Sequence, residues 1–362
     1  MERFISVDSG KFGTKVAEYH KDTDKTTVFT FRSKCSDGDF RDDAIESQTV
    51  VVEIDGQVYK IGNGARGTGA ALETNKKSDL HRLSTLTALA MLASSNEKDV
   101  MNVAIELPAK EWAVVSKRMD YKEYMLPEGD VTISIKKNSS SSIVKKTFTI
   151  KNRYVFPESI GALFMNETIK MSANPTSITG VIDIGNLNLN ATLWQGTELL
   201  QDKSTTADLG GAILIQELSQ ELTSNIVPCD ELITANILKS EDQSLPTDFS
   251  LSEEQIQASK ALIKRVKKLH ADKVKRCCNA RGWSLDVTRV VAIGGTSKDI
   301  EEELKESFGT VIILNNSEYC NAVGCLRIMC SKLLDKIIPL PVIEDKKAKV
   351  VDAPARQEKK SA

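Results

Sequence analysis

Two segments far apart in this sequence share one pattern: an apolar strand that ends in aspartate and turns through glycine into a second strand. The first covers residues 5–15 (ISVDSGKFGTK) and the second residues 180–191 (GVIDIGNLNLNA). A glycine turn of this kind presents consecutive backbone N–H groups, which bind anions such as phosphate. One such hairpin is weak evidence, but two of them predict a duplicated α/β domain that closes on a nucleotide from both sides.

Length and charge narrow the class of protein. At 362 residues the chain has room for about two domains. Its formal net charge of −2 gives no strong overall attraction to nucleic acid or to an acidic membrane surface. The sequence shows no apolar run long enough to span a bilayer and no signal peptide. These features predict a cytoplasmic protein that has no membrane partner and reaches DNA only indirectly.

Cysteine and histidine are not arranged for catalysis or metal binding. The seven cysteines form no CxxC pair and no disulfide framework, so buried or idle thiols are expected. The three histidines, His20, His81 and His270, lie among polar residues and are expected at the surface. The sequence therefore predicts neither a zinc site nor a Ser-His-Asp triad.

Hydrophobic periodicity predicts a β-rich first third followed by a mixture of helices and strands. Pro157 is expected in the first turn of a helix, and Ser250–Glu253 is expected to cap another helix. Residues from 344 onward have no periodicity and are expected to be disordered. Strands are predicted at residues 4–7, 14–19, 27–32, 48–54, 57–61, 100–107, 131–135, 143–150, 198–202, 289–293 and 310–314. Helices are predicted at residues 80–93, 110–125, 157–171, 210–223, 250–278, 298–307 and 318–336.

Each of the two hairpins carries a carboxylate at its tip, Asp8 in the first and Asp183 in the second. Bare carboxylates would repel a triphosphate, but a hydrated Mg²⁺ between them would accommodate both, because Mg²⁺ keeps several waters and needs few protein ligands. The alternative, that each aspartate only caps its turn, is weaker for two loops than for one. In the first hairpin, Lys11 or Lys15 could balance phosphate charge.

Three further motifs belong to the same pattern. Residues 290–293 are expected to form a buried strand that ends in Gly294-Gly295 and Thr296, just before the N-terminus of a helix, and helix N-termini attract anions. Glu158 follows a proline at a predicted helix start. A carboxylate there either complements the helix dipole or orients the water that attacks a terminal phosphate. The small residues at 322–324 enter the last predicted helix and suit a close helix crossing.

The order of these motifs, ending in Asn-Ala-x-Gly at residues 321–324, resembles the actin / heat-shock chaperone / sugar-kinase superfamily. Within it the chain most resembles the ParM-type bacterial actins that segregate plasmids, and residues 59–65 and 80–93 favour this branch. The resemblance covers about residues 1–340. It implies an α/β, actin-like ATPase fold with two duplicated ribonuclease-H-like domains around a nucleotide cleft. The implied boundaries are 1–165 plus 318–343 for domain I, 166–317 for domain II and 344–362 for a disordered tail.

The resemblance also implies roles for individual residues. Glu158 matches the residue that positions the hydrolytic water, and Asp8 and Asp183 match the catalytic carboxylates that face Mg²⁺ through water. The second loop departs from the family pattern, because Asn190 stands where an aspartate is common, which could weaken metal coupling or alter the hydrolysis rate. The residues that match nucleotide-binding positions are Ser9, Gly10, Lys11, Lys15, Gly185, Asn186, Asn188, Gly210, Gly211, Gly294, Gly295 and Thr296.

The implied function is an ATPase that polymerises and segregates plasmid DNA. Its cofactors would be Mg²⁺ and ATP, with GTP left open. Its partners would be further copies of the chain in a helical filament and a DNA-binding adaptor of ParR type, through which centromere DNA is reached. ATP hydrolysis would drive filament disassembly. Residues 34–46 and 138–142 are candidate filament contacts, although a solvated loop is the more ordinary expectation for each.

Two other functions remain open. One is a monomeric sugar-kinase-like or phosphatase-like enzyme of the same superfamily, which would need a substrate base that the sequence does not show. The other is a cell-shape or division actin, which usually carries an anchoring segment that is also not seen.

Overall fold

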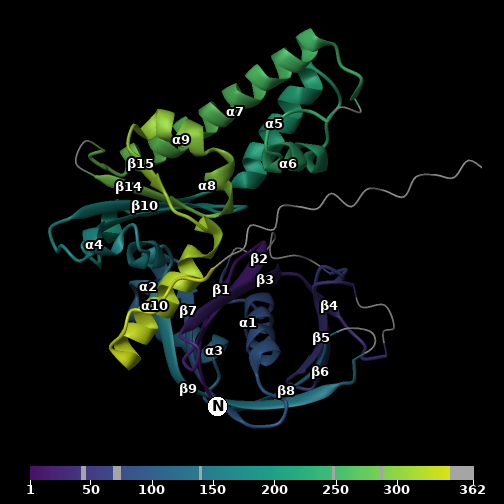
Figure 1. The fold of residues 1–362 in the computed structure, drawn as a ribbon, viewed down its shortest axis with the longest axis vertical. Coiled ribbons are helices and arrows are strands. Elements are labelled where there is room, and N and C mark those ends of the chain that lie inside the picture. The colour runs from purple at the N-terminus through teal and green to yellow at the C-terminus, as the bar shows by residue number, and fades with distance from the viewer. Residues whose placement is uncertain (42–45, 68–74, 138–140, 247–248, 286–287, 343–362) are drawn as a thin grey trace, which may run out of the picture.

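The computed structural model describes residues 1–362 except 42–45, 68–74, 138–140, 247–248, 286–287 and 343–362. The expected disordered tail and part of each candidate contact loop therefore lie outside the described residues. The described chain forms two mixed sheets, one above the other in Figure 1, with helices on their faces.

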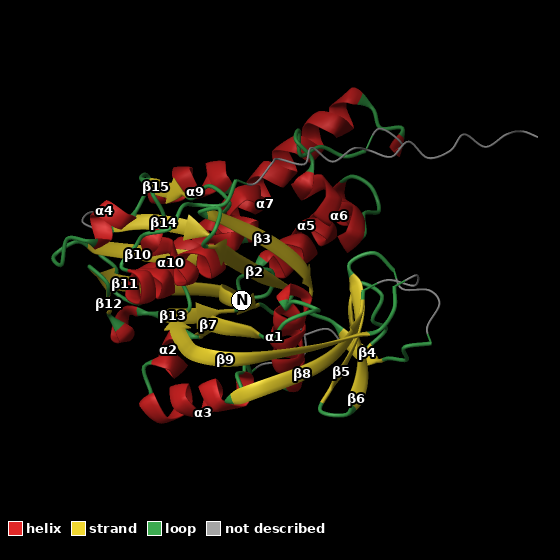
Figure 2. Cartoon of the chain, turned by 60° about the horizontal axis from the view of Figure 1, so that its bottom comes forward, coloured by secondary structure: helices red, strands yellow, loops and turns green. Residues whose placement is uncertain are grey.

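The first sheet curves around a single helix, α1 (Asp79–Leu92), which is buried along most of its length (Figure 1). Strand order is β3-β2-β1-β7-β9-β8-β5-β6-β4. Figure 2 shows the long strands β8 and β9 running towards β5, β6 and the edge strand β4. The strands are β1 (Glu2–Ser9), β2 (Gly13–His20), β3 (Lys25–Arg32), β4 (Cys35–Asp37), β5 (Thr49–Ile54), β6 (Gln57–Gly62), β7 (Asp99–Leu107), β8 (Gly129–Lys136) and β9 (Val144–Pro157).

The second sheet repeats the central arrangement of the first. In each sheet an antiparallel hairpin, β1–β2 or β10–β11, is followed by a strand parallel to its first member, β7 or β14. Strand order is β12-β11-β10-β14-β15, and β13 pairs with β11. The strands are β10 (Ile178–Ile184), β11 (Leu189–Gln195), β12 (Glu198–Leu199), β13 (Thr205–Ala207), β14 (Arg289–Ile293) and β15 (Val311–Ile313).

The remaining helices cover these sheets and join them. Helices α5, α7 and α9 form an apolar cluster with the second sheet, and a separate cluster surrounds α1. A third cluster contains residues of both sheets together with α10. The helices are α2 (Ala109–Trp112), α3 (Val115–Met125), α4 (Ile169–Ser172), α5 (Gly211–Asn225), α6 (Glu231–Lys239), α7 (Glu253–Ala280), α8 (Gly295–Asp299), α9 (Glu301–Phe308) and α10 (Cys320–Leu334), with short 3₁₀ turns η2 (Ile160–Phe164), η3 (Gln201–Lys203) and η5 (Ser317–Tyr319).

Helix α10 crosses η2 at van der Waals distance through two glycines. A Cβ on Gly324 would lie 2.1 Å from the carbonyl oxygen of Gly161, and a Cβ on Gly161 would lie 2.5 Å from the carbonyl oxygen of Cys320. Neither glycine can therefore carry a side chain unless the backbone moves. The close crossing expected from the small residues at 322–324 is confirmed.

The helix predicted at residues 157–171 is wrong. Pro157 is the last residue of β9 and pairs with Leu107, and the N–H of Glu158 donates to the carbonyl of Leu107. Ser159 then adopts a left-handed conformation with φ of 74°, which ends the extended segment without starting an α-helix. Only the 3₁₀ turn η2 and the single turn α4 follow. Glu158 therefore lies at the end of a strand.

Smaller corrections concern element boundaries. The helix predicted at 110–125 is divided into α2 and α3, and the one at 298–307 is divided into α8 and α9 at Ile300. The strand predicted at 198–202 ends at Leu199, while β4, β13 and α6 were not predicted. The capping box of α7 is formed by Ser252 and Gln255, two residues later than expected, because Ser250 has a positive φ of 50°.

The histidine prediction was wrong for two of the three residues. His81 and His270 are both fully buried, whereas His20 is partly exposed. His81 accepts or donates a hydrogen bond with Ser78, and burial lowers its pKa to about 3, so it is neutral. The cysteine prediction is confirmed: all seven thiols are free, and five of them are buried.

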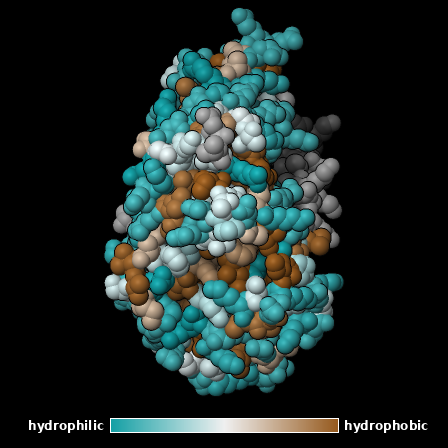
Figure 3. All heavy atoms as spheres, turned by 90° about the vertical axis from the view of Figure 1, so that its left-hand side faces the viewer, coloured by the Kyte–Doolittle hydropathy of each residue, from teal (hydrophilic) through white to brown (hydrophobic). Residues whose placement is uncertain are grey.

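The surface is mostly polar. On the face in Figure 3, apolar residues gather in patches along the middle and polar residues cover the rest. The exposed large apolar side chains include Val114, Val115 and Met119 at the junction of α2 and α3. No helix in the described part of the chain combines the length and the apolar character needed to cross a membrane.

Candidate functional site

The tips of the two predicted hairpins meet between the sheets. Lys11, in the first loop, donates a hydrogen bond of 3.4 Å from its Nζ to the side-chain oxygen of Asn188 in the second loop. Asn190, on the returning strand β11, donates from Nδ2 to Glu158 at 2.9 Å. The structure thus brings together loops that lie far apart in the sequence.

The first loop is tightly built around Gly10. Its N–H donates to the carbonyl of Asp8 at 3.0 Å, and a Cβ here would lie 2.8 Å from the carbonyl oxygen of Gly13. Only glycine fits this turn without a shift of the backbone. The hydroxyl of Ser9 is buried and donates to the carbonyl of His81 at 3.3 Å, so it ties the loop to α1.

Asp8 is held by two lysines, one on each carboxylate oxygen. Lys15, directly opposite on β2, lies 3.3 Å from Oδ2, and Lys76, just before α1, lies 3.3 Å from Oδ1. Burial favours the protonated form of Asp8, but the two ammonium groups outweigh it and hold its pKa below the usual value. The carboxylate is therefore ionised, and each of its oxygens faces an ammonium group.

Asp183 holds the matching position in the second sheet, but its surroundings differ. The residue opposite it on β11 is Asn190 instead of a lysine, and its carboxylate accepts a hydrogen bond from Asn321 Nδ2 at 2.8 Å. Among the described residues Asp183 forms no ion pair. Burial, together with the charge of Glu158, raises its pKa to about 6. Asp183 is thus the carboxylate of the site that most lacks a cation.

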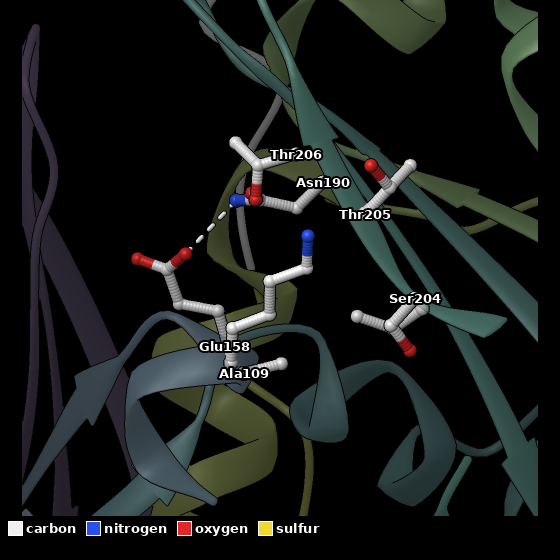
Figure 4. Close-up of a pocket in the computed structure, with 8 residues that line it drawn as sticks. Ala109, Glu158, Asn190, Ser204, Thr205 and Thr206 are labelled. Carbon is white, nitrogen blue, oxygen red and sulfur yellow. Dashed lines mark hydrogen bonds between the residues drawn. The ribbon is translucent and has the colours of Figure 1, made fainter. Parts of the chain in front are cut away.

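Glu158 is fixed by two neighbours. Lys76 forms an ion pair of 2.9 Å with Oε1, and Asn190 donates to Oε2. Asn190 is itself held by the hydroxyl of Thr206 at 2.8 Å. Figure 4 shows the carboxylate of Glu158 directed towards Asn190, beside a pocket that is also lined by Ala109 on one side and Thr206 on the other. The carboxylate therefore has one defined orientation and lies next to open space.

The first residues of α5 and α8 both contact the second loop, which contains Gly185. The carbonyl of Gly185 accepts from the N–H of Gly211 at 2.9 Å and from the hydroxyl of Thr296 at 3.1 Å. A Cβ on Gly210 would lie 2.4 Å from the carbonyl carbon of Leu187, so the start of α5 packs directly on the loop. The contacts join β10, α5 and α8 around one backbone segment.

Two glycines after β14 complete this region. Gly294 has φ of 90°, and a Cβ there would lie 2.7 Å from Oδ1 of Asp183. Gly295 is exposed, and a Cβ there would meet nothing within 4 Å. The chain therefore leaves open space at Gly295, next to the carboxylate of Asp183 and the second loop.

Every predicted site residue lies in or beside this region. Asn186 belongs to it through its carbonyl, which accepts from the N–H of Ala212 at 2.7 Å.

Sequence reasoning missed three residues of the site: Lys76, Asn321 and Glu106. Burial and the charge of Asp8 raise the pKa of Glu106 well above its usual value. Burial disfavours the charged form of Lys76, but Glu158 and Asp8 raise its pKa well above the usual value. Only Asn321 had a signal, because it belongs to the Asn-Ala-x-Gly motif.

The donor set fits Mg²⁺ with a nucleotide better than a metal held by protein ligands alone. The described residues contain no cluster of three or more His, Cys, Asp or Glu side chains that could hold a metal ion. Mg²⁺ typically uses one or two carboxylates, several waters and phosphate oxygens. Asp183, which has no lysine of its own, and Asp8 are carboxylates of this kind.

Comparison with known proteins addresses the fold. Residues 6–161 match the family model described as the N-terminal domain of actin-like proteins. No curated protein matches the sequence. Among solved structures, the Alp12 filament structure is 21% identical with a TM-score of 0.69, covering 92% of this chain and 99% of that one.

Two further structures have a similar fold at lower identity. A 15-stranded ParM filament from Clostridium botulinum is 16% identical with a TM-score of 0.67, covering 91% of this chain and 99% of that one. The archaeal actin homologue Ta0583 in complex with ADP is 15% identical with a TM-score of 0.64, covering 89% of this chain and 97% of that one. The predicted fold class is confirmed: the chain has the actin-like fold, a mixed α/β architecture with two mixed sheets.

Proposed function

We propose that this protein is an actin-like ATPase that assembles into filaments and segregates plasmid DNA through a DNA-binding adaptor of ParR type. The observation that carries the proposal is the meeting of two hairpin tips from separate sheets, with Asp8, Lys15 and Asp183 next to the turns. A ligand with several phosphates is the chemistry that such facing loops and cations fit.

The nucleotide would lie between the two loops. Lys11, Lys15 and the backbone N–H groups of the first loop would bind phosphate oxygens, and the exposed Gly295 beside the second loop would admit the sugar and base. Asp8 and Asp183 would hold Mg²⁺ through water, and when bound it would neutralise phosphate charge. ATP is proposed as the nucleotide, with GTP as an alternative.

Glu158 would orient the attacking water. Its carboxylate is paired with Lys76, fixed by Asn190 and adjacent to the pocket in Figure 4. Phosphoryl transfer needs mainly positioning and charge neutralisation, so one oriented carboxylate is enough to place the water. Because Glu158 follows β9 and Asn190 lies on β11, their bond would also link the position of the water to the relative position of the two sheets.

The same arrangement suggests how nucleotide state would reach the filament. We propose domain I at residues 1–165 plus 318–343 and domain II at 166–317. Within domain I, the close crossing of α10 and η2 at Gly161 and Gly324 holds residues 318–343 against the N-terminal part. A nucleotide that contacts both hairpins favours the closed arrangement of the domains, and hydrolysis weakens that preference. Closed subunits would assemble, and hydrolysis would loosen the filament.

Filament formation and plasmid segregation are proposed by analogy with the structures of similar fold. Two of those structures are filaments, one of Alp12 and one of ParM. The net charge of −2 is compatible with a protein that reaches centromere DNA only through an adaptor.

The test is sedimentation and light scattering of the purified protein at tens of micromolar with Mg²⁺ and ATP, ADP or no nucleotide. Filaments that form with ATP and disassemble as phosphate is released support the proposal. Phosphorylation of a sugar without any pellet would instead identify the kinase alternative, and assembly that requires lipid vesicles would identify the membrane-linked one. Absence of nucleotide-dependent assembly overturns the proposal.

A further inference from the structure

Lys76 bridges two carboxylates of the candidate site, Asp8 and Glu158. Its ammonium lies 3.3 Å from Oδ1 of Asp8 and 2.9 Å from Oε1 of Glu158, and the residue is only 7% exposed. It comes from the segment just before α1, so it enters the site from outside both hairpins and all three glycine motifs.

We propose that Lys76 is a catalytic residue that binds the terminal phosphate of the nucleotide and stabilises the charge that develops on it during hydrolysis. The inference rests on the proposed function, because it uses the roles given there to Asp8 and Glu158. If Asp8 faces the metal and Glu158 faces the attacking water, the atom that touches both lies beside the phosphoryl group that passes between them.

The hydrogen-bonding capacity of Lys76 leaves room for this contact. An ammonium has three N–H donors, and two of them point to carboxylates here. Lys15 already neutralises the other oxygen of Asp8 at 3.3 Å, so Asp8 keeps one lysine when Lys76 turns to a phosphate. Lys76 can therefore keep its shorter contact, to Glu158, and exchange the longer one for a phosphate oxygen.

The balance of charges in the site also favours a contact between Lys76 and the terminal phosphate. A terminal phosphate placed beside Glu158 and Asp183 would face two carboxylates, which disfavours its binding. Lys76 is the described cation that contacts Glu158, and it removes this repulsion at the point of reaction. Stability alone does not account for a lysine here, because a buried ion network is seldom more stable than apolar residues of the same volume.

The first experiment separates phosphate recognition from folding without depending on turnover. In a Glu158→Gln background, in which hydrolysis is slow, the affinities for Mg²⁺-ATP and Mg²⁺-ADP are measured by calorimetry with and without Lys76→Met. The double variant loses one positive and one negative charge together, so it keeps the charge balance of the site. We expect Lys76→Met to lower ATP affinity about 10- to 100-fold and to leave ADP affinity within about threefold, because ADP lacks the terminal phosphate.

The second experiment uses the otherwise unchanged chain. Lys76→Met is expected to lower kcat for ATP hydrolysis at least about 100-fold, the usual cost of removing a group that stabilises transition-state charge, and Lys76→Arg is expected to restore part of it. Lys77→Met is the matched control. Lys77 is the next residue and pairs with Asp120 instead of the site, at 2.6 Å, so its variant should keep the kcat of the unchanged protein.

The results separate the role of Lys76 from the proposed function of the whole chain. Equal losses of ATP and ADP affinity, or an unchanged kcat in Lys76→Met, overturn the role of Lys76 while nucleotide-dependent assembly of the unchanged chain still supports the proposed function. A chain that binds neither nucleotide before any substitution overturns both.

Discussion

The different surroundings of Asp8 and Asp183 predict that a substitution in the candidate site raises the free energy of unfolding. Replacing Asp183 by asparagine should stabilise the nucleotide-free protein at pH 8. Asparagine keeps the shape and the oxygen that accepts from Asn321, but it removes a charge that forms no ion pair with any residue the structure describes. The same substitution at Asp8, in the matching position of the first hairpin, should have the opposite effect.

The magnitude follows from the pKa. The pKa of Asp183 is raised from 3.8 to about 6 by burial and the charge of Glu158, and each tenfold change in an ionisation constant corresponds to about 1.4 kcal/mol. An upper limit is therefore ~3 kcal/mol. Because the side chain is partly exposed, screening by water reduces this, and we expect about 1–2 kcal/mol. That corresponds to a rise in Tm of roughly 2–8 °C for a folding unit of this size.

How the stabilising effect of Asp183→Asn changes with pH depends on whether folding raises or lowers the pKa of Asp183. A carboxyl whose pKa is higher in the folded protein than in the unfolded chain destabilises the fold when it is ionised. The penalty is complete above about pH 6 and disappears as the pH falls from 6 to about 4. The advantage of Asp183→Asn should therefore be full at pH 8, smaller at pH 5 and absent near pH 4.

The assay is thermal unfolding of Asp183→Asn, Asp8→Asn and the unchanged protein, each with and without Mg²⁺-ATP. Asp8→Asn should lower stability by about 3–5 kcal/mol, because it leaves the buried Lys76 and the partly buried Lys15 facing one carboxylate fewer. Mg²⁺-ATP should raise the Tm of Asp183→Asn less than that of the unchanged protein. A lower Tm for nucleotide-free Asp183→Asn at pH 8 would refute the reasoning.

Three further predictions address hydrolysis, phosphate binding and packing. Glu158→Ala should slow phosphate release and give long-lived filaments, and rapid disassembly at the normal ATPase rate, followed by light scattering, would contradict its role. Lys11→Ala should weaken ATP binding severalfold by calorimetry, because it removes a cation and the bond to Asn188; unchanged affinity and turnover would remove Lys11 from the site. Gly324→Ala should lower the free energy of unfolding by about 1–3 kcal/mol in a denaturant titration, because its Cβ would overlap the backbone of Gly161. Unchanged stability of Gly324→Ala would contradict the close crossing.

Local pattern was sufficient for most strands and for the loops of the site. The hairpins at residues 5–15 and 180–191, and the turn at Asp55-Gly56, were found because alternation and glycine position are short-range signals. The helix predicted from Pro157 failed because pairing with β7 and contact with α10 govern that segment. His81 was misplaced for a similar reason: its sequence neighbours are polar, but α1 lies inside the curve of the first sheet.

The sequence by itself determined the two hairpins whose turns suit phosphate binding, the acidic residue Glu158 and the glycine pairs, because each is a local arrangement of residues. Only the tertiary structure decided how they share charge. It places Lys15 and Lys76 on Asp8, leaves Asp183 with an amide from Asn321, and extends Lys76 to Glu158. The pair of Asp8 and Lys15 lies across one hairpin, whereas the contacts of Lys76 and Asn321 join side chains that are far apart in the chain. Burial strengthens those long-range contacts because charge is screened less than in water, and no local pattern contains them.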